Sequence, residues 1–269
     1  MSQIPDDIVD HILDFLRSDL YILNRCAQSH PRLSKLSERH IFANVILSDD
    51  FHLYRDSLIL ATSKFIKILS KRPIIAKHVR SLSVHVSDIG QESWTEHLCG
   101  VASLLPTLSG LNSFQLKSTN GMSSWRKLPC MFYQPLLDFL HRQGKKEVSI
   151  FGVRYFPLSL LNISKDVTVK LDKCEYTQCD DESSTMDAYL EALEHFSIIR
   201  CSDKCLESIL AWPRIHSLRS LEYKAGWSAE EPVNFLPKMV VACSSSLTNF
   251  CLHFSYHCGS PSPCKTPPQ

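Results

Sequence analysis

Glycine is scarce in this chain, at 8 of 269 residues. Loops that cradle phosphates depend on glycine, and the sequence contains neither a P-loop nor a GxGxxG turn. It also lacks the GxSxG and HExxH patterns of hydrolases and zinc peptidases. The acidic trio Asp180-Asp181-Glu182 lies in a polar run typical of a solvated loop. We therefore expect a protein that is not an enzyme, with no catalytic residues and no cofactor. An active site built from scattered residues stays open as an alternative.

Long apolar runs and an excess of one charge are also missing. No stretch reaches the roughly 18 uncharged apolar residues of a membrane-spanning helix, and Asp6, Asp7 and Asp10 interrupt any N-terminal signal peptide. With 29 basic and 28 acidic residues, the chain has no strong field for nucleic acid or an anionic membrane. The sequence therefore predicts a cytoplasmic or nuclear protein with no nucleic-acid partner and no membrane partner, whose 11 cysteines are thiols.

No cysteine pair has the CxxC spacing of a zinc site. The residues that could be combined into one are Cys174, Cys179, Cys201, Cys205, His253, His257, Cys258 and Cys264. Their intervals fit no usual zinc finger or ribbon. Several cysteines lie in helix-like or strand-like runs, where a thiol behaves as a small apolar side chain. We predict no metal site.

Residues 4–47 have the pattern of three short helices. In IPDDIVDHILDFL, Pro5 suits a helix start, and the acidic residues after it complement the helix dipole. Ser18 or Asp19 can cap a second helix, and Pro31 can open a third. The apolar stripe of the first helix is Ile8, Ile12, Leu13 and Leu16. Little chain precedes this stripe, so either the rest of the molecule or another protein is expected to cover it.

The rest of the chain alternates between two patterns. Short segments with an apolar–x–apolar centre predict strands with one buried face; they are 80–84, 112–116, 147–150, 166–169, 196–199, 219–223 and 248–252. Helical patterns separate most of them, at 94–105, 135–144, 205–212 and 232–243. The strand spacing, roughly 20 to 35 residues, is that of solenoids whose strand–helix units share one core.

The predicted fold class is therefore α/β, with a small N-terminal three-helix unit followed by an irregular strand–helix solenoid like a leucine-rich repeat. The usual asparagine of such repeats is absent from the matching places, and an ordinary α/β layer is the alternative. We divide the chain into a helical domain at 1–47, a connecting helix within 48–75 and an α/β domain at 76–257. The Pro/Ser-rich tail at 258–269 is expected to be disordered.

The N-terminal segment resembles an F-box. Ile4-Pro5 and the acidic pair match the beginning of that family's motif, Leu20, Leu23 and Cys26 match its second helix, and RHIFANVIL at 39–47 is similar to its close. The resemblance covers about a sixth of the chain. It departs from the motif at Gln28-Ser29, where the family has an apolar pair, and at Leu33, where it often has an aromatic residue.

The resemblance implies a function and a set of partners. F-box proteins bind a Skp-type adaptor, and through it a cullin, in an SCF E3 ubiquitin ligase, while a C-terminal domain captures a protein substrate. The residues expected to bind the adaptor are Ile4, Pro5, Ile8, Ile12, Leu13, Leu16, Leu20, Leu23 and Phe42. The alternative is an interaction scaffold with a degenerate F-box that no longer joins a ligase. The identity of the substrate is not encoded in any motif.

Two further features have a plain and a functional interpretation. The run from Lys64 to Arg80 holds six basic residues and no acidic one; it is a solvated helix face or a contact for an acidic partner. The tryptophans are expected in the core or at repeat edges, but Trp125 and Trp227 lie in loop-like contexts and are the better candidates for exposed contacts.

Overall fold

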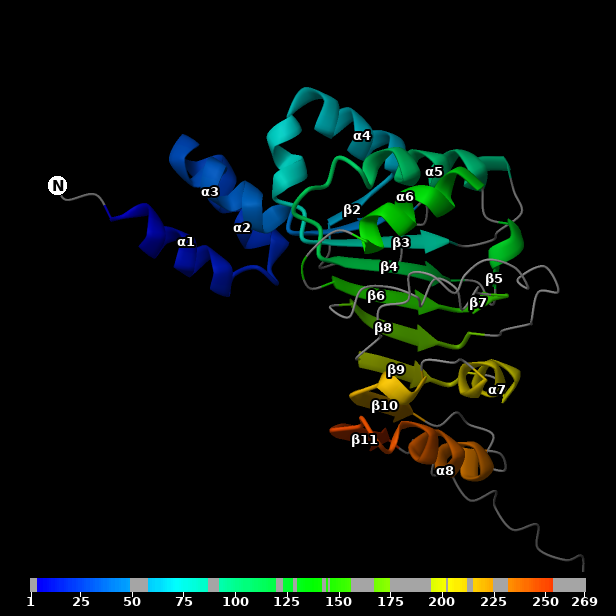
Figure 1. Ribbon diagram of the computed structural model, residues 1–269. Coiled ribbons are helices and arrows are strands. Elements are labelled where there is room, and N and C mark those ends of the chain that lie inside the picture. Colours follow the sequence, from blue (N-terminus) through cyan, green and yellow to red (C-terminus); the bar gives the residue numbers. More distant parts are fainter. Residues whose placement is uncertain are drawn as a thin grey trace, which may run out of the picture.

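The computed structural model describes residues 4–48, 58–86, 92–119, 123–127, 130–141, 144, 146–155, 167–174, 195–201, 203–211, 215–224 and 232–253. It begins with helices α1 (Asp6–Phe15), α2 (Leu20–Ser29) and α3 (Pro31–Ile41), which contact one another. The side chain of Asp19 caps α2 by accepting a hydrogen bond from the Ile22 N–H at 3.0 Å. Figure 1 shows these helices beside the amino ends of the first strands of a large sheet.

Parallel strands form the body of the protein. Within the described residues the main sheet has nine strands, in the order β11-β10-β9-β8-β6-β4-β3-β1-β2, and every pair is parallel. The strands are β1 (Asn44–Leu47), β2 (Leu58–Leu60), β3 (Ser81–Val86), β4 (Ser113–Ser118), β6 (Lys146–Phe151), β8 (Val167–Asp172), β9 (His195–Ile199), β10 (Ser220–Lys224) and β11 (Asn249–His253). A short pair, β5 (Ser123–Ser124) with β7 (Val153–Arg154), lies beside it.

Helices connect many of the strands, and their apolar faces close the core. They are α4 (Thr62–Lys71), the 3-10 helix η1 (Pro73–Lys77), α5 (Glu92–Leu104), α6 (Cys130–Leu140), α7 (Asp203–Leu210) and α8 (Pro232–Cys243). Neighbouring helices pack in chain order along the sheet (Figure 1). Phe114 on β4, for example, is fully buried against Phe132 and Phe139 of α6. The α/β class with a leucine-rich-repeat-like solenoid is therefore confirmed.

All seven predicted strands are present, because each places alternate apolar side chains on the helix-covered face. In β6, Val148 and Ile150 are buried, while Glu147, Ser149 and Phe151 are partly exposed. Two further strands of the main sheet were not predicted, and neither was the short pair β5 and β7. β1 uses the apolar run that closes the N-terminal motif, with Val45 and Leu47 buried, and β2 pairs with it. The sheet therefore begins before residue 76, and the connecting helix expected within 48–75 is α4, which spans Thr62–Lys71.

A repeated turn follows β6, β8 and β9, and it explains the missing asparagines. The residue after each strand has a positive φ: 68° at Gly152, 53° at Lys173 and 50° at Arg200. The next residue points into the core and, in two turns, is a cysteine. Cys174 Sγ lies 3.5 Å from the carbonyl oxygen of Ile150 in the preceding strand, and Cys201 Sγ lies 3.6 Å from that of Leu171. These thiols satisfy backbone carbonyls between repeats, as an asparagine amide would.

Candidate docking surface

Ion pairs hold α1 against α3. The guanidinium of Arg32 donates to the carboxylate of Asp6 and to the carbonyl oxygen of Ile4. One turn later, a carboxylate oxygen of Asp10 accepts from Arg39 at 2.8 Å and lies 2.7 Å from His40 Nε2. These contacts anchor the acidic side of α1 to α3. The orientation of its apolar residues is thereby fixed as well.

The three helices have a small core of their own. Leu13, Leu23, Leu36 and Ile41 form a cluster that is separate from the core of the sheet. Phe42 and Leu58 are partly buried and pack against both clusters. The three-helix unit is therefore a folded body with a narrow apolar connection to the sheet. An ion pair between Arg72, the residue directly after α4, and Glu38 on α3, at 2.6 Å, strengthens that connection.

A second set of apolar residues, on α1 and just before it, is exposed to solvent. The exposed fractions are 56% for Ile4, 50% for Ile8, 51% for Ile12 and 76% for Phe15. From Ile8 onward these positions follow one another at spacings of four and three, so they lie on one face of the helix. We call these four residues the α1 apolar face. Figure 1 shows α1 at the outside of the molecule, away from the sheet.

The second helix also carries exposed apolar side chains. Tyr21 is 69% exposed and Ile22 is 38% exposed, at the amino end of α2. The carboxyl end of α2 is exposed too, but it carries the polar pair Gln28 and Ser29. The exposed apolar residues of α2 are therefore at its amino end.

The nine residues predicted to bind an adaptor fall into three groups in the structure. Ile4, Pro5, Ile8 and Ile12 are exposed; Leu16, Leu20 and Phe42 are partly buried and pack on the small core; Leu13 and Leu23 are in that core, with 2% and 0% exposed. Phe15, the most exposed large apolar residue of α1, was not among the nine. Its position three residues after Ile12 is the signal that could have identified it.

The basic run on α4 and the tryptophans were the other two features singled out in the sequence. Lys64, Lys67 and Lys71 are exposed on α4 while Phe65 is buried, an arrangement compatible with a solvated helix face and with a contact for an acidic partner. Trp125 is only 9% exposed, so the prediction that it forms an exposed contact is wrong; its indole contributes to the main core. Trp227 and the tail at 258–269 lie outside the described residues.

The face of the sheet opposite the helices is lined by polar side chains. Its middle row, read across the register, is Ile46, Ser83, Gln115, Ser149, Lys170, Ser197, Glu222 and Cys251. Ion pairs cross the strands at Glu147–Lys170, with 2.8 Å between the charged atoms, and at Asp172–Arg200, with 2.7 Å. We call this surface the open face. Its short hydroxyl and amide side chains allow the backbone of another protein to approach closely.

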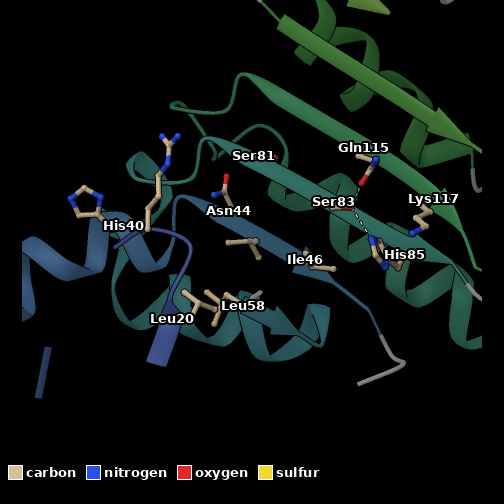
Figure 2. A pocket seen from close by; sticks show the side chains of 12 residues that line it. Leu20, His40, Asn44, Ile46, Leu58, Ser81, Ser83, His85, Gln115 and Lys117 are labelled. Atoms are coloured by element: carbon tan, nitrogen blue, oxygen red, sulfur yellow. Dashed lines mark hydrogen bonds between the residues drawn. The ribbon is translucent and has the colours of Figure 1, made fainter. Parts of the chain in front are cut away.

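A cleft of about 310 Å³ lies where the open face meets the three-helix unit. Arg17 and His40 line it from the helices, and β3 and β4 contribute polar side chains (Figure 2). The hydroxyl of Ser83 donates to Gln115 Oε1 at 2.7 Å and lies 2.9 Å from His85 Nε2. The cleft is an irregular polar depression whose Ser83, His85 and Gln115 side chains are already bonded to one another.

The imidazole of His85 makes stability depend on pH. Burial, and then the charge of Lys117, lower the pKa of His85 to about 4, from an ordinary value of 6.5. The unfolded chain therefore takes up this proton near pH 6.5 while the folded protein takes it up only near pH 4. We predict that the urea midpoint falls as the pH is lowered from 6.5 to 4. The fall should be smaller in His85→Gln, whereas His141→Gln, at an exposed site, should behave like the original protein.

Metal sites and membrane-spanning helices are two further features to consider. In the described part of the chain, no group of three or more His, Cys, Asp or Glu side chains is placed to hold a metal ion. Over the same residues, no helix is both long enough and apolar enough to cross a membrane. The α1 apolar face and the open face are candidate surfaces for binding another protein.

Comparison with known proteins gives no relative: no protein-family model, no curated protein and no solved structure matches this chain. Any function must therefore be inferred from the residues described above.

Proposed function

We propose that this protein is the substrate-receptor subunit of an SCF-type cullin ubiquitin ligase. The three-helix unit would act as an F-box and bind a Skp-type adaptor, and the solenoid would bind a protein substrate. The observation that supports this most is the α1 apolar face, which a folded unit with its own core leaves half or more exposed. Isolated surface apolar residues are ordinary, but a continuous helix face of them is typical of a protein–protein interface.

The energetics of such an interface are favourable. Complete burial of an Ile or Phe side chain contributes about 1.5–3 kcal/mol. Ile8, Ile12 and Phe15 are half or more exposed, so a partner groove would gain much of this from each. Association costs several kcal/mol in translational freedom and side-chain ordering. Residues of the α1 apolar face can offset that cost.

In this proposal the solenoid performs no bond chemistry. It would hold a substrate protein on the open face, so that its lysines stay near a ubiquitin carrier recruited by the cullin. Proximity of this kind raises the effective concentration of the reacting groups. The polar, partly ion-paired open face is suited to a protein surface of mixed charge.

Co-expression with a Skp-type adaptor, followed by size-exclusion chromatography, tests the proposal. We expect the two chains to elute together at a one-to-one ratio. Separate elution at micromolar concentration, with this chain folded by circular dichroism, would contradict it.

A scaffold that joins no ligase is the second candidate, because one observation favours it. Gln28 and Ser29, at the positions of the family's apolar pair, are both exposed on α2, and the Ser29 hydroxyl bonds back to the Cys26 carbonyl at 2.8 Å. A pull-down from cell extract separates the candidates. Recovery of a cullin with the adaptor supports the receptor, and recovery of other proteins without either supports the scaffold.

A further inference from the structure

The final strand leaves an open edge on the sheet. β11 pairs with β10 on one side, and no described strand pairs with it on the other. The Asn249 N–H donates to the Arg219 carbonyl oxygen toward β10, at 2.9 Å. Because N–H and C=O groups alternate in direction along a parallel strand, those of Phe250 and Leu252 point away from the sheet. Two residues of β11 therefore present donors and acceptors at this edge for which the described part of the chain supplies no partner.

The side chains at this edge are unusual for an unprotected strand. Exposed edges normally carry lysine, proline or another charge that prevents pairing with a second chain. The strand Asn249–His253 reads NFCLH and contains neither lysine, proline, aspartate nor glutamate. Phe250 is 39% exposed at the end of the apolar layer. Helix α8 lies beside β11 in Figure 1, and Val241 of that helix is 72% exposed. The last repeat therefore ends with an apolar layer that nothing described covers.

We propose that this edge pairs with the β11 edge of a second copy of the chain, giving a symmetric dimer with one continuous sheet. The sequence NFCLH is suited to antiparallel self-pairing about Cys251. Phe250 then lies opposite Leu252 of the second copy, and those two residues exchange both backbone hydrogen bonds. On the open face, Asn249 lies opposite His253, so polar residues meet polar residues. No like charges are brought together, since the strand has no acidic side chain and no lysine or arginine.

A second copy fits this edge better than the chain's own C-terminal tail. Residues 258–269 contain four prolines, at 261, 263, 267 and 268. Proline lacks the N–H that a new ladder requires and is poorly tolerated in a paired strand. The proposal also does not depend on the proposed function, because the α1 apolar face belongs to α1, at the far end of the strand order from β11.

The pairing makes a sharp geometric prediction for Cys251, an exposed free thiol. It would face its own copy at a position without hydrogen bonds, where opposite Cα atoms are about 4.5 Å apart. That separation lies within the range that a disulfide spans, about 4.4–6.8 Å. Mild oxidation with diamide, which takes one hydrogen from each thiol, should therefore join two chains through Cys251. Peptide mass spectrometry identifies the link, and Cys251→Ser should remove it.

Sedimentation velocity on the full chain at about 100 µM tests the association itself, since edge pairing of this size belongs to the weak class of interfaces. We expect a dimer that dissociates on dilution. Leu252→Pro removes an outward-pointing N–H, together with some packing of a partly buried side chain on the core, and should weaken the dimer about tenfold or more, through two lost hydrogen bonds per dimer. Phe250→Asp should weaken it as well, by placing two carboxylates across the interface.

Ile74→Asp, at a 51% exposed site on η1 far from β11, is the matched control and should leave the dimer intact. Circular dichroism confirms that each variant is folded. A monomer at 100 µM overturns the proposal, and so does a dimer that survives Leu252→Pro and gives no Cys251 link. Loss of adaptor binding with the dimer preserved would refute the proposed function and leave this inference standing.

Discussion

Replacing Ile8 and Ile12 together by aspartate should abolish co-purification with a Skp-type adaptor, with a loss of affinity of about 100-fold or more. Both side chains are about half exposed, so the change removes little from the protein's own core. In a complex, however, it would place two carboxylates against an apolar groove, where no new interaction compensates for the free-energy cost of their desolvation. Isothermal titration calorimetry with purified adaptor measures the loss, and Phe15→Asp alone should produce a smaller loss of the same kind.

The matched control is Met131→Asp on α6, where the side chain is 64% exposed and far from α1. It introduces the same charge on the same type of surface and should leave adaptor affinity unchanged. A substitution at Leu16 is less informative, because that side chain packs on the small core and its loss also affects folding. Full adaptor affinity in the Ile8→Asp, Ile12→Asp variant would remove the main support for an F-box.

The strands could be predicted because apolar and polar residues alternate along a strand according to which side chains are buried. In β4, Phe114 and Leu116 are buried and their neighbours are partly exposed, and this pattern is visible in the letters alone. β1 and β2 could not be predicted in the same way. They have four and three residues, too few for an alternating pattern to be distinguished from the end of a helix. Pairing with β3, which begins 37 residues after β1 does, is what makes β1 a strand.

The candidate docking surface was predicted only in part, for a related reason. Helical spacing identifies apolar residues, but it does not say whether a residue faces its own core or a partner. Leu13 and Ile12 are adjacent in sequence and both belong to the predicted set, yet one is 2% and the other 51% exposed. The contacts of Asp10 with Arg39 and His40 hold one side of α1 against α3. Those contacts join residues about thirty positions apart, beyond the reach of a local pattern.

The separation of the two cores leads to the last prediction. Leu23 is fully buried in the cluster of the three-helix unit, and Phe114 is fully buried in the cluster of the sheet. Leu23→Ala should cost about 2–5 kcal/mol and Phe114→Ala about 3–5 kcal/mol, since each leaves a cavity in a packed core. Because Phe42 and Leu58 are the only described residues that pack on both clusters, we expect the effects to remain local.

Hydrogen exchange measured by mass spectrometry distinguishes local from global destabilisation. Leu23→Ala should raise exchange in α1–α3 and leave β4, β6 and β8 protected, and Phe114→Ala should do the reverse. Arg72→Met, which removes the ion pair to Glu38 at the junction, is the intermediate case and should loosen the three-helix unit alone by a smaller amount. Equal loss of protection in both regions for either core variant would mean that the helices and the sheet unfold as one unit. In that case the three helices would form an N-terminal layer of the solenoid rather than a module free to bind a partner.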